Sequence, residues 1–187
     1  MNIETCMRLY HTGRTEIRKP DISVGRKNAD FGPGFYLTPD SDFAWRWASG
    51  EAVVSVFDLD LSGLRVCRFT RTEEWFRYIF SNRRAEDTLD ADVVVGPIAN
   101  DTIFETLGII TSGFLKSADA LQLLMIGPEY TQVALKTEKA AEQLQWLSSS
   151  VVTAADVQAH RADLRAEQED YQRKFAAALE HIGGFGS

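Results

Sequence analysis

The chain has few of the residues from which metal sites and disulfide frameworks are built. It contains two cysteines, Cys6 and Cys67, and three histidines in 187 residues, and none of them has metal-ligand spacing. Two cysteines make no disulfide framework, which favours a reducing compartment. No apolar run approaches the length needed to span a bilayer, and the N-terminus lacks the apolar core of a signal peptide. We therefore expect a cytoplasmic protein with no metal site and no membrane contact.

Motifs of the common nucleotide-binding and hydrolytic enzymes are missing as well. The sequence contains no G-x-x-x-x-G-K-[ST], G-x-G-x-x-G, H-E-x-x-H or G-x-S-x-G. The formal net charge is −7, so the field of the whole molecule does not favour nucleic acid. Only the N-terminal segment is locally basic, which suits either a phosphorylated ligand or an ordinary solvated surface. Its basic residues are Arg8, Arg14, Arg18, Lys19, Arg26 and Lys27.

The segment Gly25–Thr38, GRKNADFGPGFYLT, is the most distinctive in the chain. Its GPG sequence predicts a turn, because glycine tolerates positive φ and proline fixes its own. A short apolar strand is expected at 35–37, and Thr38 followed by Pro39 predicts a helix start with Thr38 as N-cap. Glycines beside an aromatic strand let a flat ligand approach the backbone. A plain turn before a core strand explains the pattern equally well.

The remaining patterns predict a mixed α+β chain. Strands are expected at 7–11, 35–37, 52–60, 64–69, 92–95 and 130–136. Helices are expected at 39–49, 72–82, 100–107, 118–126 and 138–147. Ser62-Gly63 indicates a hairpin between the strands at 52–60 and 64–69.

The C-terminal part differs in composition. Thr153 and Asp156 resemble a capping box, and apolar residues then recur at three-to-four spacing in a charged sequence. We expect one long amphipathic helix that packs on the domain or on a partner. The three serines at 148–150 suggest a boundary, which gives a domain at 1–150 and a helix at 151–187. The apolar stripe consists of Val157, Leu164, Tyr171, Phe175, Ala178 and Ile182.

Three side chains stand out as candidates for chemistry. His11 ends the first predicted strand, where a lone histidine is more often structural. Tyr36 lies among core-like residues, where an aromatic usually packs. Gln132 lies in YTQVALK, where a polar residue is unusual if it points inward.

With these residues the chain resembles the ADP-ribosyltransferase superfamily, and within it a bacterial domain-of-unknown-function branch. The branch carries LYHG, GR…DFG-x-GFYLT and V-x-GP motifs. They read here as LYHTG at 9–13, Gly25-Arg26 with Asp30–Thr38, and VVGP at 94–97. The likeness covers roughly residues 8–147. It implies an α+β split β-sandwich with flanking helices, to which the long C-terminal helix is added, and it implies NAD as the substrate.

The resemblance also implies a role for each candidate. His11 would bond the adenosine ribose of NAD, Tyr36 would stack on nicotinamide, and Gln132 stands where the family carries a catalytic Glu. Gln can orient a ribose hydroxyl but cannot offset positive charge. Slow transfer, a different acid such as Asp101 or Glu129, and loss of activity therefore stay open. The further residues that match NAD-binding positions are Thr12, Gly13, Arg26, Asp30, Phe31 and Gly34.

The implied activity is mono-ADP-ribosyl transfer from NAD to a macromolecular acceptor, expected to be a protein. Such an enzyme would act as an intracellular bacterial toxin or modifier, and a toxin of a toxin–antitoxin pair would have a small neutralising protein as its partner. Two alternatives are NAD glycohydrolase activity at the same site and a catalytically inactive NAD-binding or protein-interaction module.

Overall fold

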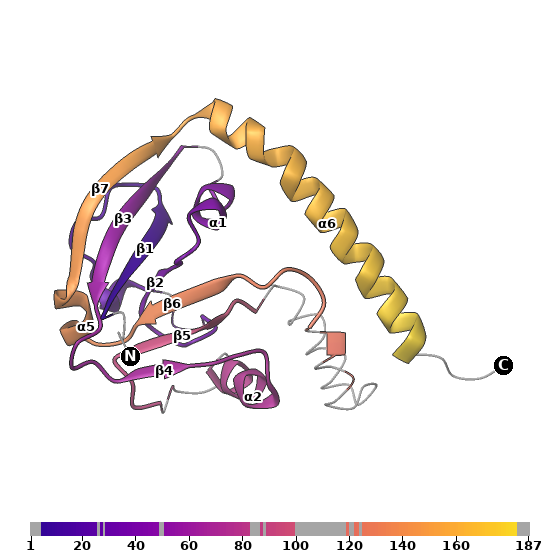
Figure 1. Ribbon diagram of the computed structural model, residues 1–187, viewed down its shortest axis with the longest axis horizontal. Coiled ribbons are helices and arrows are strands. Elements are labelled where there is room, and N and C mark those ends of the chain that lie inside the picture. The colour runs from indigo at the N-terminus through magenta and orange to yellow at the C-terminus, as the bar shows by residue number, and fades with distance from the viewer. Residues whose placement is uncertain are drawn as a thin grey trace.

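The computed structural model describes residues 5–25, 27, 29–48, 51–82, 87, 89–99, 119, 122–123 and 125–182. In chain order the elements are β1 (Cys6–Gly13), η1 (Ile22–Val24), β2 (Phe35–Leu37), α1 (Ser41–Arg46), β3 (Ala52–Asp60), β4 (Val66–Arg68), α2 (Glu73–Asn82), β5 (Val93–Pro97), β6 (Thr131–Leu135), α5 (Glu138–Glu142), β7 (Leu144–Val152) and α6 (Ala154–Ile182). The mixture of strands and helices confirms the predicted α+β class (Figure 1).

The strands form two sheets. The first has the order β1-β3-β7, and both of its strand pairs are antiparallel. The second has the order β2-β6-β5-β4, with β6 antiparallel to both β2 and β5 and with β4 parallel to β5. Strand β6 is therefore central in its sheet, although it comes late in the chain.

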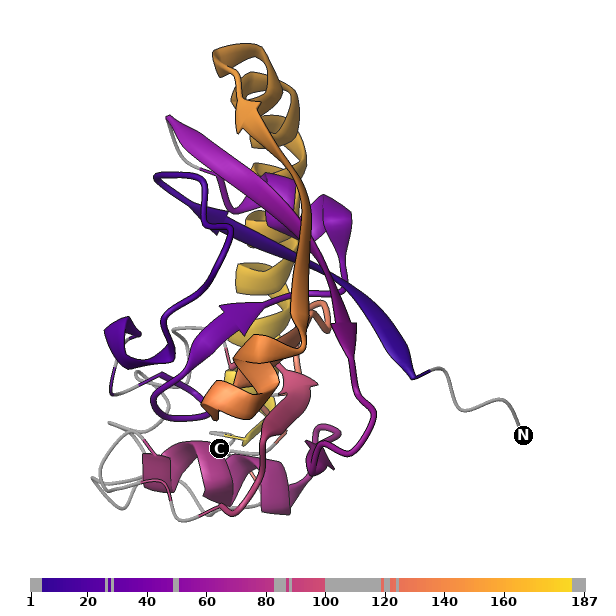
Figure 2. The ribbon, with the colours of Figure 1, turned by 90° about the vertical axis from the view of Figure 1, so that its left-hand side faces the viewer.

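The main core lies between the two sheets. Because side chains alternate along a strand, Val133 and Leu135 of β6 face Leu9 and Phe57 of the first sheet. Ala134 points to the other face, where it joins Trp75 and Ile79 of α2 in a second buried cluster. Figures 1 and 2 show α2 on the side of the second sheet away from β1, β3 and β7. The second sheet is thus covered on both faces.

The predicted hairpin at Ser62-Gly63 is wrong. Strand β4 belongs to the second sheet, where Cys67 lies opposite Val94 of the parallel strand β5. The chain leaves the first sheet because Arg65 is held at the start of β5: its backbone N–H donates to Asp92 Oδ2 over 2.8 Å, and its guanidinium pairs with the same carboxylate.

The helix predicted at 138–147 is also wrong in its second half. Helix α5 ends at Glu142, and 144–152 form β7, which pairs with β3 along its length. The hydroxyls of Ser149 and Ser55 lie 3.0 Å apart across this pair. The serines at 148–150 are therefore part of a strand. The division into 1–150 and 151–187 stays a prediction.

The start of α1 differs from the prediction by two residues. Asp40 is the N-cap, and its carboxylate accepts from the backbone N–H of Phe43. Thr38 is used elsewhere, since its backbone bridges Tyr10 of β1. The local sequence alone did not distinguish the two caps.

The predicted C-terminal helix is confirmed as α6, which has 29 residues. Its capping box is formed: the backbone N–H of Thr153 donates to Asp156 Oδ2, and that of Asp156 donates to Thr153 Oγ1. No residue of α6 is buried, and Figure 1 shows it running from the end of β7 past α1. The helix predicted at 100–107 lies outside the described residues, and the one predicted at 118–126 is described only at 119, 122–123 and 125–126. Within the described ones, no helix is long and apolar enough to cross a membrane.

Candidate functional site

Strands β1, β2 and β6 meet at Thr38. Its backbone exchanges two hydrogen bonds with Tyr10, of 2.8 and 2.9 Å, which ties β1 to the end of β2. Its hydroxyl donates to the carbonyl of Thr131, at the start of β6, over 2.8 Å. The two sheets are thereby joined close to His11 of β1, Tyr36 of β2 and Gln132 of β6.

His11 is held by the main chain of β2. Its Nδ1 lies 2.7 Å from the carbonyl oxygen of Tyr36, and its ring centroid lies 4.4 Å from that of Phe35. A carbonyl only accepts, so Nδ1 carries the proton and donates. Burial lowers the pKa of His11 below its ordinary value, against the opposing effect of the carbonyl bond. The neutral ring then leaves Nε2 as an acceptor, and a side chain at Gly13 would crowd it, since a Cβ there would lie 3.1 Å from Nε2.

Tyr36 lies opposite Ala134 and so faces the cluster beneath the second sheet. Its hydroxyl donates to the carbonyl of Gly32 over 2.6 Å and accepts from the backbone N–H of Phe31 over 3.0 Å. Burial raises the pKa of the phenol well above its ordinary value, so the hydroxyl stays protonated. The hydroxyl thus holds the preceding turn, and a contact to a ligand would come from the ring.

The turn at 30–34, here called the anchored turn, is fixed by groups distant in sequence. Lys136 donates to the carbonyl of Phe31 and pairs with Asp87 over 2.7 Å, and both charged side chains are at most 9% exposed. Gly32 has φ of +74°, which favours glycine. Gly34 runs close to β6, since a Cβ there would lie 2.5 Å from the carbonyl oxygen of Leu135. The predicted GPG turn is therefore a tightly enclosed one.

Asp30 begins this turn and contacts Gln132 directly. Asp30 is 7% exposed, and its Oδ2 accepts from the backbone N–H of Ala99 over 2.8 Å and from Gln132 Nε2 over 2.9 Å. Asn82 donates to the Asp30 carbonyl over 3.2 Å. Gln132 points inward, as its place in an apolar strand suggested, and lies on the same face of β6 as Ala134. Among the residues that the structure describes, none donates to Gln132 Oε1.

The other candidates are placed as follows. Thr12 donates to the carbonyl of Ala44 over 2.6 Å and so fastens β1 to α1. Glu129 is about half exposed, with its carboxylate 3.9 Å from the guanidinium of Arg71. Arg26 and Asp101 lie outside the described residues. Tyr36, Asp30, Phe31 and Gln132 are grouped on one face of the second sheet, and His11 reaches this group through the Tyr36 backbone. Their roles stay predictions.

Sequence reasoning missed Lys136 and Asp87. Lys136 directly follows an apolar strand, and a lysine at that position is a weak signal of a buried ion pair. Asp87 falls in a segment that reads as a polar loop, so its partner could not be inferred. Tyr78 of α2 also donates to Asp87 over 3.1 Å, which completes the support under the turn.

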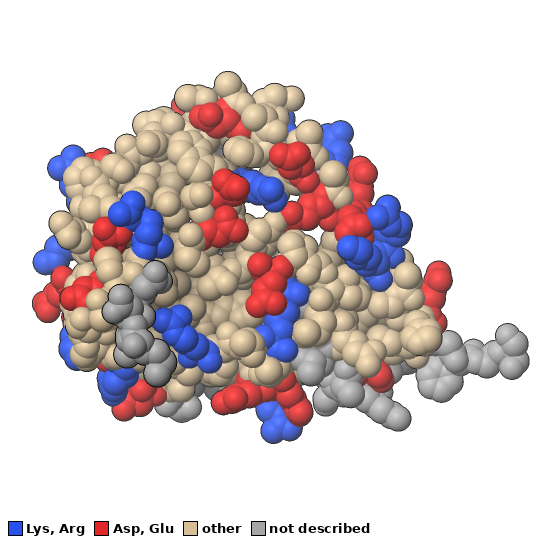
Figure 3. Space-filling model, in the orientation of Figure 1, with Lys and Arg blue, Asp and Glu red and all other residues tan. Residues whose placement is uncertain are grey.

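Two residues of the local basic patch pair with carboxylates. Arg8 pairs with Asp58 across β1 and β3, and Arg18 pairs with Glu16 while lying over the ring of Trp146. Figure 3 shows basic and acidic side chains interspersed over one face of the molecule. In the described part of the chain, no group of three or more His, Cys, Asp or Glu side chains could hold a metal ion.

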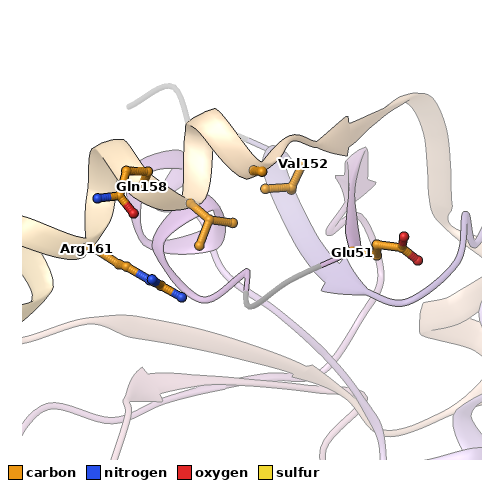
Figure 4. Close-up of a pocket in the computed structure, with 6 residues that line it drawn as sticks. Glu51, Val152, Gln158 and Arg161 are labelled. Carbon is orange, nitrogen blue, oxygen red and sulfur yellow. The ribbon is translucent and has the colours of Figure 1, made fainter.

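One surface pocket lies apart from these residues, at the junction of β7 and α6 (Figure 4). It has a volume of about 360 Å³ and brings Glu51, before β3, near Arg161 of α6. None of the predicted site residues lines it. The lining consists of Glu51, Val152, Ala154, Val157, Gln158 and Arg161.

A comparison with family models identifies the family. The model described as "Protein of unknown function (DUF3990)" matches residues 7–146, which is well over half of the chain. The chain belongs to this family. No curated protein and no solved structure matches the chain.

Proposed function

We propose that this DUF3990 domain is an ADP-ribosyltransferase that moves ADP-ribose from NAD to a macromolecule. The observation that carries the proposal is the meeting of β1, β2 and β6 at Thr38. His11, Tyr36 and Gln132, which are distant in the sequence, lie on these three strands near that point. The resemblance in the sequence motifs implies the same three positions.

His11 is suited to a ribose hydroxyl. Its Nδ1–H is used by the Tyr36 carbonyl, and burial keeps the ring neutral, so Nε2 can accept a hydrogen bond. The adenosine ribose of NAD offers such donors. The Tyr36 ring would contact the nicotinamide face, an interaction that needs no hydroxyl. Its own hydroxyl is already bonded within the anchored turn.

The reaction breaks the bond between C1′ of the ribose and the pyridinium nitrogen of NAD. The bonding pair leaves with the nitrogen, which becomes neutral nicotinamide, while positive charge develops at C1′ and the ring oxygen. A lone pair on an oxygen or nitrogen of the acceptor then forms the new bond to C1′, and the acceptor's proton passes to solvent. Gln132 Oε1 would accept from a ribose hydroxyl and hold C1′ in place. An acceptor protein, a toxin role and a neutralising partner rest on the resemblance alone.

The test is nicotinamide release from NAD labelled in its adenylate part. The purified chain should release nicotinamide, and label should appear on added protein in equal amount. Arg77→Ala, which changes an exposed residue of α2, is the matched control and should leave the rate unchanged.

The other results separate the alternatives. Label found only in free ADP-ribose would indicate a glycohydrolase, and NAD binding without release would indicate an inactive module. Absence of binding heat at millimolar NAD would overturn the whole proposal.

A further inference from the structure

We propose that Asp30 is a positioning residue for Gln132 and supplies, through the amide, the negative charge that a glutamine lacks. The inference rests on the proposed function. It changes the expected role of Asp30, which the sequence motifs suggested as an NAD contact. It also gives a physical reason for Gln at 132, where the resembling family carries Glu.

The geometry fixes which way the amide points. A carboxylate only accepts hydrogen bonds, so Nε2 of Gln132 must face Asp30 Oδ2, as their 2.9 Å contact shows. Oε1 must then face away from Asp30. Asp30 itself is held by the N–H of Ala99 on the same oxygen and by Asn82 on its main chain, so it cannot turn aside. One of the two amide orientations is thereby selected.

The charge of Asp30 acts through this bond. A hydrogen bond to a buried carboxylate is charge-assisted, and it polarises the amide toward Oε1. Oε1, the negative end of the amide dipole, becomes a stronger acceptor for the ribose hydroxyl. It faces the ribose carbon C1′, on which positive charge develops. The carboxylate thus contributes to the transition state without touching the substrate.

The same contact explains why Glu is unfavourable here. A carboxylate at position 132 would meet Asp30 Oδ2 with no hydrogen between them, and two like charges in a buried site do not both ionise near neutral pH. The two groups would share one proton. We therefore expect Gln132→Glu alone to be impaired, although it restores the residue type of the resembling family.

The experiment uses Asp30→Asn, Gln132→Glu and the double variant, with nicotinamide release and NAD affinity measured for each. Asp30→Asn should lower kcat by about tenfold to a hundredfold, the range found when outer partners of metal ligands are removed, with KM for NAD changed by less than about threefold. Gln132→Glu should be impaired at neutral pH and should regain activity as pH rises and the shared proton is lost. In the double variant the amide introduced at position 30 can donate to the carboxylate introduced at position 132. Its kcat should therefore return to within about threefold of wild type, and the added pH dependence should disappear.

Asp92→Asn is the matched control. Asp92 is also a buried carboxylate, but its partners are Arg65 and Thr137, beside α5 and away from Gln132. It should lose stability and keep kcat. Equal kcat in wild type and Asp30→Asn, a change in KM alone, or losses that simply multiply in the double variant would each overturn the proposal.

A second measurement does not depend on turnover. The side-chain ¹H–¹⁵N signals of Gln132, identified by their loss in Gln132→Ala, should be shifted and slow to exchange in wild type and in Asp92→Asn. They should resemble free amide signals in Asp30→Asn. Unchanged signals in Asp30→Asn would overturn the positioning role. If the signals do change in Asp30→Asn but the wild-type chain releases no nicotinamide, only the proposed function is overturned.

Discussion

The anchored turn and helix α6 are opposite kinds of structure within one chain. The turn is five residues long, and it accepts hydrogen bonds from Tyr36 of β2, from Asn82 of α2, from Ala99 beyond β5, and from Gln132 and Lys136 in and after β6. Helix α6 has 29 residues, none of them buried. The turn depends on partners distant in the sequence in addition to its glycines and Tyr36, while the helix has its own capping box and ion pairs.

This difference shows where the chain uses its buried polar groups. Each polar group of the turn that leaves water needs a partner, because an unpaired buried group is costly. Those partners come from four separate segments, so the turn has one conformation. Helix α6 buries no residue, so few of its polar groups need a partner within the protein. We infer that the backbone conformation is fixed most tightly at 30–34.

The largest loss of stability is expected when the ion pair of Lys136 and Asp87, beneath the turn, is broken. Lys136→Met should lower the free energy of unfolding by about 3–5 kcal/mol, because Asp87 is then left buried without its partner. Urea denaturation measures this loss. Adding Asp87→Leu should recover much of it, and a loss below about 1 kcal/mol in Lys136→Met would mean that the turn does not depend on the pair.

Tyr36 has two expected roles, because its hydroxyl holds the anchored turn and its ring would stack on nicotinamide. Two variants separate these roles. Tyr36→Phe should cost about 1–3 kcal/mol of stability, since the N–H of Phe31 and the carbonyl of Gly32 lose their partner. It should keep most NAD affinity, while Tyr36→Ala should lose roughly 1–3 kcal/mol of binding by calorimetry, on the scale of base–aromatic stacking. Equal loss of affinity in both variants would argue against ring stacking.

The smallest loss of stability is expected when a contact between α6 and the rest of the domain is removed. Glu167 accepts from Arg46 over 3.0 Å and from the Tyr130 hydroxyl over 2.5 Å, and the ion pair is about one-quarter to one-third exposed. Glu167→Ala should therefore cost no more than about 1 kcal/mol in urea denaturation. A loss well above about 2 kcal/mol would show that α6 belongs to the cooperative core, and the contrast with the anchored turn would fail.

Features with a local cause could be predicted from the sequence. The strand at 35–37 and the helix at 72–82 follow from apolar spacing, and α6 follows from its cap and stripe. The inward position of Gln132 followed from a polar residue within an apolar strand. For the site, the patterns singled out His11, Tyr36 and Gln132 as candidates, and only the family resemblance implied that they lie together.

Features that depend on pairing between distant segments could not be predicted from the sequence. The sequence around Ser62-Gly63 is a good hairpin turn, but β4 pairs with β5 in the other sheet, beside the contact of Arg65 with Asp92. The serines at 148–150 gain strand structure from β3. The bond between Asp30 and Gln132 joins residues that no local pattern connects.

The central position of β6 has a consequence for how the protein is made. Strands β2 and β5 are hydrogen-bonded to β6 and not to each other, and β6 comes late in the chain. During synthesis the second sheet cannot close until the ribosome has released the residues through Leu135, and contacts of such long sequence separation form slowly. The Gln132 amide reaches Asp30 only at that moment. A nascent or truncated chain that ends before β6 therefore carries the motif-rich N-terminal segment without an assembled site.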